Sequence, residues 1–104
     1  MVNQRVIDTV KQYIMIIPKD FGVKRAYLFG SFAKGSEKEE SDIDIALVME
    51  NMPDFFIAQK QLMKLRRKID LRIEPHPFKE QDFNSLNPLA YEIEKTGIEI
   101  TVHK

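Results

Sequence analysis

Residues 27–48 read Tyr27-Leu-Phe-Gly-Ser-Phe-Ala-Lys-Gly-Ser-Glu-Lys-Glu-Glu-Ser-Asp-Ile-Asp-Ile-Ala-Leu-Val48, and they are the most informative part of the chain. It contains the end of one predicted strand, Lys24–Phe29, and most of a second, Asp42–Met49. The second strand alternates in character, with three large apolar residues on one face, Ile43, Ile45 and Leu47. Gly30-Ser31 ends the first strand and precedes what looks like one helical turn. We therefore expect two strands joined through a short turn that contains glycine.

The Gly30-Ser31 pair is a candidate anion site. Glycine adopts positive φ and allows a ligand to approach the backbone closely. The free N–H groups of such a turn bind anions, and the Ser31 hydroxyl adds a donor. Gly35 then allows the chain to turn away. These features suit the β- and γ-phosphates of a triphosphate, although a Gly-Ser pair after a strand is often only a turn.

Asp42 and Asp44 are two residues apart on a strand, so their carboxylates project from one face. Adjacent carboxylates repel each other unless a cation neutralises them. Mg²⁺ prefers oxygen ligands and commonly uses one or two carboxylates together with phosphate oxygens. The pair is therefore a candidate magnesium site, and the alternative is an exposed structural pair.

A third carboxylate comes from a predicted strand at residues 69–74. If this strand lies beside Asp42–Met49, the Asp70 carboxylate joins the other two and completes a site for two-metal phosphoryl transfer, in which Asp70 is also the general base. Glu74, on the same face of that strand, is the competing third carboxylate. The structural alternative for Asp70 is a solvated residue paired with Arg72 or Arg66.

The remaining elements alternate between helix and strand, which predicts an α/β fold with a helix-flanked sheet. A helix ends before Pro18 and buries Val2, Val6, Val10, Tyr13, Ile14 and Ile17. A helix capped by Asp54 buries Phe55, Ala58, Leu62, Leu65 and Ile69. Pro75-His76-Pro77 is expected to stop the 69–74 strand, and His76 is more typical of a structural residue than of a ligand, although it lies close enough to line a cleft. A last helix runs from Asn87 and Pro88 to Gly97, followed by an edge strand at 98–102.

The composition of the chain limits the classes of function that we expect. The chain has 104 residues, which fits one domain over residues 1–104, and its 16 basic and 16 acidic residues give a net charge of zero. Zero net charge gives no reason to expect nucleic-acid binding. No apolar run is long enough for a membrane helix, and the start of the chain lacks the pattern of a signal peptide. The absence of cysteine suits the reducing cytoplasm.

The spacing Gly30-Ser31, ten residues, Asp42-x-Asp44 resembles the signature of the polymerase-β-like nucleotidyltransferase superfamily. The short length and the Gly-Ser-x-Ala-Lys-Gly…Ser-Asp-x-Asp form resemble its minimal branch. The resemblance implies a small mixed sheet flanked by helices. It also implies nucleotide binding and two Mg²⁺ ions, and the positions concerned are Gly30, Ser31, Lys34 and Ser41 for nucleotide and Asp42, Asp44 and Asp70 for metal. Lys34 stands where the family usually has arginine, so a planar bidentate contact is lost there.

The resemblance also implies an acceptor. The minimal branch is similar to the antitoxins of HEPN/MNT toxin–antitoxin pairs, which implies AMP transfer from ATP to a tyrosine of a HEPN-type protein partner. Two alternatives remain at this point. One is a non-catalytic module that neutralises its partner by contact, and the other is a small-molecule adenylyltransferase. The lysines at steps of four, Lys60, Lys64 and Lys68, are interpreted as a solvated face, with docking of an acidic partner as the alternative.

Overall fold

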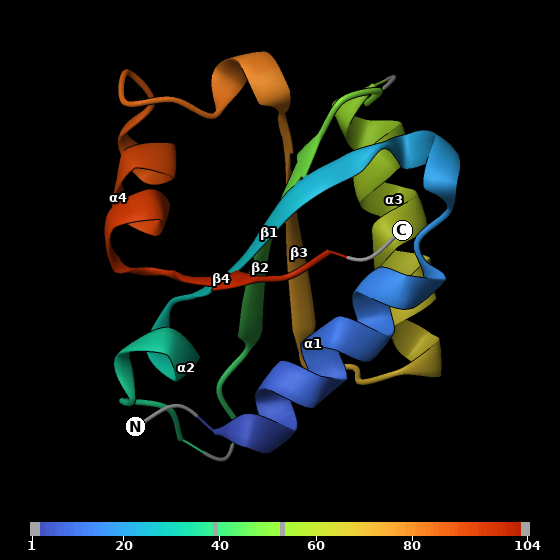
Figure 1. Cartoon of the computed structure of the whole chain (residues 1–104). Coiled ribbons are helices and arrows are strands. Elements are labelled where there is room, and N and C mark those ends of the chain that lie inside the picture. Colours follow the sequence, from blue (N-terminus) through green and yellow to red (C-terminus); the bar gives the residue numbers. More distant parts are fainter. Residues whose placement is uncertain (1–2, 39, 53, 103–104) are drawn as a thin grey trace.

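The computed structural model describes residues 3–38, 40–52 and 54–102 and contains a four-stranded mixed sheet. Its order is β3-β2-β1-β4, with β1 at Val23–Phe29, β2 at Ile43–Met49, β3 at Ile73–Lys79 and β4 at Ile98–Ile100. β2 is antiparallel to β1 and parallel to β3, and β4 is antiparallel to β1. Consequently β1 ends at the same end of the sheet at which β2 and β3 begin (Figure 1). The expected α/β class, with a small mixed sheet and flanking helices, is confirmed.

Helices cover both faces of this sheet (Figure 1). α1 (Gln4–Ile16) and α3 (Phe55–Leu65) lie on one face, and α4 (Pro88–Thr96) lies on the other. The short α2 (Ser31–Lys34) follows β1 directly, and single 3-10 turns occupy Lys19–Phe21, Arg66–Lys68 and Glu80–Asp82. Among the described residues, no helix has the length and apolar character needed to cross a membrane.

The larger core lies between the sheet and the pair α1 and α3. It takes the apolar side chains of the strand positions that alternate toward this face, including Leu28, Ile43, Ile45, Leu47 and Ile73, each with 0% exposure. The buried hydroxyl of Tyr13 on α1 donates a hydrogen bond of 2.7 Å to the Leu62 carbonyl on α3. That bond satisfies a polar group whose burial raises the pKa of Tyr13.

The helix boundaries follow the capping residues that the sequence predicts. α1 stops before Pro18, with Ile17 already extended. The Asp54 side chain accepts hydrogen bonds from the Phe56 and Ile57 backbones at the start of α3. Asn87 caps α4 in the same way, and Gly97 ends it. Val2, which was expected in the buried stripe of α1, lies outside the described residues.

The predicted stripe of α3 is wrong at its first position. Ala58 and Leu62 are fully buried, and Leu65 and Ile69 pack against the core at its edge. Phe55, however, is 47% exposed. It occupies the first turn of α3 and lines a surface groove together with Phe78 and Leu86, so the helical period alone overestimates its burial.

The third strand also differs from the prediction. It was expected at residues 69–74 and to end before Pro75, but β3 runs from Ile73 to Lys79 and contains both prolines. β3 is an edge strand, and the Ile43 N–H donates to the Arg72 carbonyl, so alternate backbone groups from Ile73 onward face away from β2. The nitrogens of Pro75 and Pro77 therefore fall on the outer side, where the ladder needs no donor.

Candidate functional site

The candidate site lies at the end of the sheet where β1 ends and β2 and β3 begin. Asp44 on β2 pairs in register with Phe29 on β1 and with Glu74 on β3. These three residues lie on the sheet face opposite to α1 and α3, because their neighbours Ile43, Ile45 and Ile73 fill the larger core. The Asp44 side chain is 27% exposed, so it is accessible at this end of the sheet.

Gly30 is in direct contact with Asp44. It has φ 77° and ψ −151° and precedes the first turn of α2. A Cβ at this position would lie 2.5 Å from Asp44 Oδ2, so a side chain here would displace the carboxylate. The sequence separates the two residues, yet the β1–β2 pairing brings the predicted phosphate turn against the predicted metal ligand. The absence of a side chain at Gly30 therefore allows the turn to lie close to the Asp44 carboxylate.

The turn after Gly30 is compact. The Lys34 N–H donates to the Gly30 carbonyl, and the Ser36 N–H donates to the Ser31 carbonyl. Within the described part of the chain no side chain caps the start of α2, so its first N–H groups are left for an outside acceptor. Gly35, with φ 74°, ends the turn, as expected. Phe32 is buried and anchors α2 in the larger core.

The other predicted nucleotide contacts lie around this turn. Lys34 is exposed in the last turn of α2. The Ser41 hydroxyl oxygen accepts a hydrogen bond of 2.8 Å from the Lys38 N–H, so it closes the loop that leads to β2. Asp42 is exposed and directly precedes β2, two residues from Asp44. The structure thus gathers Gly30, Ser31, Asp42 and Asp44 at one end of the sheet.

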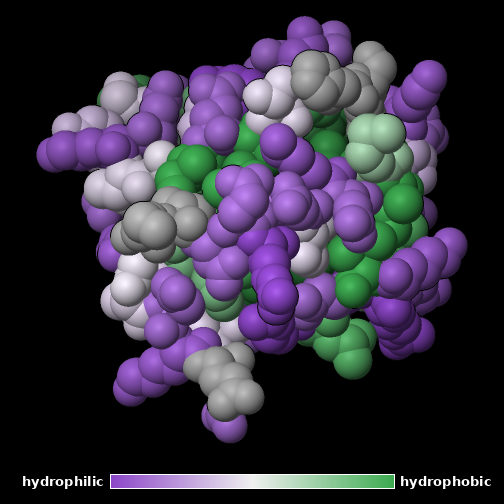
Figure 2. All heavy atoms as spheres, turned by 60° about the horizontal axis from the view of Figure 1, so that its bottom comes forward, coloured by the Kyte–Doolittle hydropathy of each residue, from purple (hydrophilic) through white to green (hydrophobic). Residues whose placement is uncertain are grey.

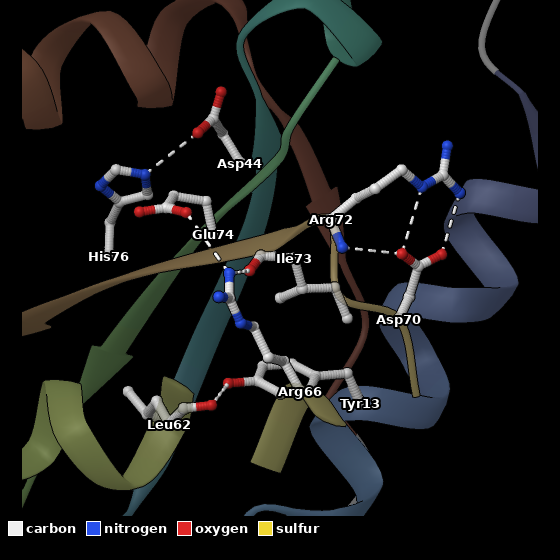
Figure 3. Close-up of polar contacts among 9 residues, drawn as sticks. All are labelled: Tyr13, Asp44, Leu62, Arg66, Asp70, Arg72, Ile73, Glu74 and His76. Carbon is white, nitrogen blue, oxygen red and sulfur yellow. Dashed lines mark hydrogen bonds and ion pairs between the residues drawn. The ribbon is translucent and has the colours of Figure 1, made fainter. Parts of the chain in front are cut away.

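Asp70 does not lie on a strand, which corrects the predicted position. It belongs to the connection between the Arg66–Lys68 turn and β3. Its Oδ1 accepts hydrogen bonds from the Arg72 N–H and Nε, at 2.8 and 3.1 Å, and its Oδ2 accepts one from Nη2 at 2.9 Å. The bond from the Arg72 side chain is the main cause that holds the Asp70 pKa below its ordinary value. Figure 3 shows Asp70 directed at Arg72 and well separated from Asp44.

Glu74 occupies the position beside Asp44 that was expected for Asp70. The two residues are register partners on adjacent parallel strands, so their side chains share one face. Glu74 Oε2 lies 3.7 Å from Arg66 Nη1, and that same nitrogen donates to the Ile73 carbonyl at 3.0 Å. Arg66 therefore holds the start of β3 while it partly neutralises Glu74 (Figure 3). Glu74, the competing third carboxylate in the sequence, is thus the residue that lies beside Asp44.

His76 is the residue of this site whose contact the sequence analysis missed. Its Nε2 lies 3.1 Å from Asp44 Oδ1, and its ring packs edge-on against Phe29 with centroids 5.0 Å apart. Because Pro75-His76-Pro77 was expected to end the strand, His76 was not expected to lie beside Asp44 on β2. The useful signal was the alternation of Glu74, His76 and Phe78, which places all three on one face once the prolines are accepted within an edge strand.

The donor set fits Mg²⁺ in its usual mode. Among residues 3–38, 40–52 and 54–102, no three His, Cys, Asp or Glu side chains are grouped closely enough to hold a metal ion by themselves. Mg²⁺ does not require such a cage, because it commonly takes one or two carboxylates and completes its shell with water and substrate phosphates. Asp42 and Asp44, beside the Gly30 turn, supply carboxylates of this kind.

The surface around this end of the molecule is mixed in character. Figure 2 looks toward the bottom of Figure 1, where α2 and the starts of β2 and β3 lie, and shows hydrophilic residues with separate apolar patches among them. A separate groove of about 670 Å³ lies at the opposite end of β3 and is lined in part by Phe55, Phe78 and Leu86. It contains none of the candidate site residues.

The family assignment agrees with this geometry. The chain belongs to the family described as "Polymerase beta, Nucleotidyltransferase", whose profile matches residues 11–104. The chain is 33% identical over 101 residues to the "Putative protein adenylyltransferase MJ0141" of Methanocaldococcus jannaschii, covering 91% of this chain and 98% of the relative. The protein is therefore a nucleotidyltransferase, as the resemblance in its sequence implied.

Solved structures support the same fold. The crystal structure of a toxin–antitoxin with AMP-PNP matches with a TM-score of 0.65 and 24% identity, covering 94% of this chain and 74% of that one. The crystal structure of the toxin–antitoxin MntA-HepT matches with a TM-score of 0.59 and 22% identity, covering 97% and 74%. At these identities the comparison establishes a shared fold alone.

Proposed function

We propose that this nucleotidyltransferase transfers AMP from ATP, in the presence of Mg²⁺ and with release of pyrophosphate, to a tyrosine hydroxyl of a HEPN-type toxin and so acts as its antitoxin. The contact between the Gly30 turn and the Asp44 carboxylate carries the catalytic part of this proposal, because it unites a phosphate-binding turn with a metal ligand. The name of the M. jannaschii relative supports a protein acceptor. The structural similarity to toxin–antitoxin proteins supports the partner.

In this proposal the residues at this end of the sheet have separate roles in phosphate binding and metal binding. The start of α2, with Gly30 and the Ser31 hydroxyl, binds the phosphates, and Lys34 and Ser41 contribute at the rim. Asp42 and Asp44 hold Mg²⁺, and two ions are expected. When bound, the metal neutralises phosphate charge and lowers the pKa of the attacking hydroxyl. The protein's own task is to align the nucleotide with that hydroxyl and to accept its proton.

Asp70 and Glu74 are the two candidates for the third carboxylate, which also accepts the proton. Glu74 lies beside Asp44 on the neighbouring strand, whereas the Asp70 carboxylate makes three hydrogen bonds to Arg72. The Asp70 carboxylate is directed at Arg72 and lies apart from Asp44 (Figure 3). These contacts favour Glu74 for the role that the family resemblance assigns to Asp70.

The surface of the molecule favours a protein acceptor. Large apolar side chains are exposed near the starts of α3 and α4, and they are Phe55, Phe56, Ile57, Leu86 and Leu89. Apolar side chains gathered on a surface commonly mark a protein interface. The net charge of zero gives no support for a nucleic-acid acceptor. We propose the cytoplasm as the compartment, since the chain has no cysteine and its proposed substrate is ATP.

The proposal is tested by incubating the purified chain with Mg²⁺, ATP and the protein encoded beside it, and then measuring intact mass and mapping the modified residue. We expect one or more AMP groups on a tyrosine of the partner. The double variant Asp42→Asn/Asp44→Asn should abolish the mass shift, and Asp8→Asn, an acid-to-amide change on α1, should preserve it. A tight complex without a mass shift would show a non-catalytic module. AMP transfer only to small hydroxyl compounds would show a small-molecule enzyme.

A further inference from the structure

The Asp44 carboxylate has different surroundings at its two oxygens. Oδ1 lies 3.1 Å from His76 Nε2. Oδ2 lies on the side of Gly30, because a Cβ added to that glycine would be 2.5 Å from it. One oxygen is thus directed at β3, and the other at the turn that we propose binds phosphate. Figure 3 shows the imidazole of His76 directed at the Asp44 carboxylate.

The direction of the hydrogen bond follows from the chemistry of the two groups. A carboxylate offers only acceptor oxygens, so the contact requires a proton on His76 Nε2, which donates to Oδ1. An oxygen that already accepts this bond has less capacity left for a cation. Oδ2 is then the atom of Asp44 that is better suited to coordinate a metal beside the phosphate turn.

His76 is itself held in place from several sides. Its ring packs against Phe29 at an interplanar angle of 63°, and Phe29 is the register partner of Asp44 on β1. Pro75 and Pro77 flank it and restrict the backbone of β3, since proline fixes φ. The Glu74–Arg66 contact holds the start of the same strand. A side chain this constrained can fix the orientation of the group to which it donates.

We propose that His76 is a positioning residue, whose Nε2–H holds Asp44 Oδ1 so that Oδ2 stays directed at the Gly30 turn for metal and phosphate. This inference rests on the proposed function, because it assigns Asp44 to the metal. Residues that orient a metal ligand typically change metal affinity or activity by about 10- to 100-fold when they are removed. His76 acts in this way through Asp44 and does not itself contact the substrate.

Two substitutions separate the hydrogen bond from the packing. His76→Phe keeps an aromatic ring against Phe29 but removes the donor. His76→Gln loses the ring but retains an N–H₂ donor at a similar reach. Binding of Mn²⁺, as a paramagnetic probe, is titrated by electron paramagnetic resonance in the presence of AMP-PNP. We expect His76→Phe to bind Mn²⁺ at least about tenfold more weakly and His76→Gln to stay near the wild type.

Equal Mn²⁺ affinity in the wild type and His76→Phe, with both variants folded by circular dichroism, would overturn the proposal. So would a loss in His76→Gln as large as that in His76→Phe, because the packing would then be responsible. In the transfer assay, raising Mg²⁺ should restore much of the kcat of His76→Phe. If the wild type binds Mn²⁺ through His76-oriented Asp44 but transfers no AMP to the partner, the proposed function alone fails.

Discussion

The two faces of the sheet use the same strands for different purposes. On the face under α1 and α3, every second residue of β2 is apolar and fully buried, as in Ile43, Ile45 and Leu47. On the other face, α4 and Phe83 cover Ala46 and Val48. Toward the start of β2 this cover ends, and the side chains there, Asp44, Glu74 and His76, are polar and partly exposed.

This difference shows how a small chain accommodates both a core and a site. Alternation along a strand sends neighbouring residues to opposite faces, so Ile43 and Ile45 stabilise the fold while Asp44 between them faces solvent. Substitutions on the two faces should therefore have separable effects. Changes at the open end should impair activity with little loss of stability, and changes beneath α1 and α3 should do the reverse.

The largest expected effect is that of Asp44→Asn. Removing a metal ligand should lower AMP transfer more than about 100-fold, since even the loss of a residue that orients a ligand costs 10- to 100-fold. Asparagine retains an oxygen that can accept from His76, so the melting temperature should stay near the wild-type value. Transfer kinetics and differential scanning calorimetry measure the two quantities. Near-full turnover at ordinary Mg²⁺ would refute the role of Asp44.

Leu47→Ala tests the opposite face of the same strand. Leu47 is fully buried, so the loss of its side chain should lower the free energy of unfolding by about 2–5 kcal/mol. For a chain of this length, that corresponds to a fall in melting temperature of on the order of 10 °C or more. Activity per folded molecule should be retained at low temperature. Urea unfolding, combined with active-site titration, measures both. If Leu47→Ala kept its stability but lost its activity, the two faces of the sheet would not have separable roles.

Glu74→Gln and Asp70→Asn form a matched pair that identifies the third carboxylate. Glu74 lies beside Asp44, so its neutralisation should lower kcat by about tenfold or more. Asp70→Asn should change kcat little, because that carboxylate is bonded to Arg72. Both substitutions remove one negative charge, so they control for net charge. A larger loss of kcat in Asp70→Asn would restore Asp70 to the role that the sequence alone suggested.

Gly30→Ala tests the contact between the turn and Asp44. Gly30 has φ 77° and ψ −151°, a combination that essentially only glycine adopts, so alanine costs about 1–3 kcal/mol, and its Cβ would displace the Asp44 carboxylate. Gly35→Ala is the control at the far end of α2, where φ 74° and ψ 16° are left-handed helical and alanine costs roughly 1–2 kcal/mol. We expect Gly30→Ala to lose more activity per folded molecule than Gly35→Ala. Equal activities would mean that the contact has no role in catalysis.

The smallest expected effect concerns the pH dependence of stability. Arg72 holds the Asp70 pKa below its ordinary value of 3.8, so the folded state gains stability from ionised Asp70 above that pH. The gain should be lost as the pH falls through the lower folded value. Asp70→Asn should therefore be less stable than the wild type at neutral pH, by under about 1 kcal/mol, and the difference should shrink in acid. Urea unfolding at several pH values measures it, and a difference that widens in acid would contradict this assignment.

Much of the fold was predictable because the responsible signals are local. The alternation of Ile43, Ile45 and Leu47 identified β2 and the orientation of Asp44. The caps Asp54 and Asn87 set the starts of α3 and α4, because a side chain two or three residues away supplies their hydrogen bonds. The Gly30-Ser31 turn was predictable in the same way, and its spacing to Asp42 and Asp44 carried the family resemblance.

Local signals were therefore sufficient to infer the fold class, the nucleotidyltransferase family and the turn and carboxylates expected to act together. Local signals were not sufficient to tell which side chains of β3 lie beside Asp44, because this depends on how the strands pair. Whether Pro75 and Pro77 end a strand depends on whether that strand lies at the edge of the sheet, which no local pattern states. The parallel register of β2 with β3 then places Glu74, and not Asp70, beside Asp44. It also joins His76 to a residue 32 positions away, because strand pairing depends on long-range packing.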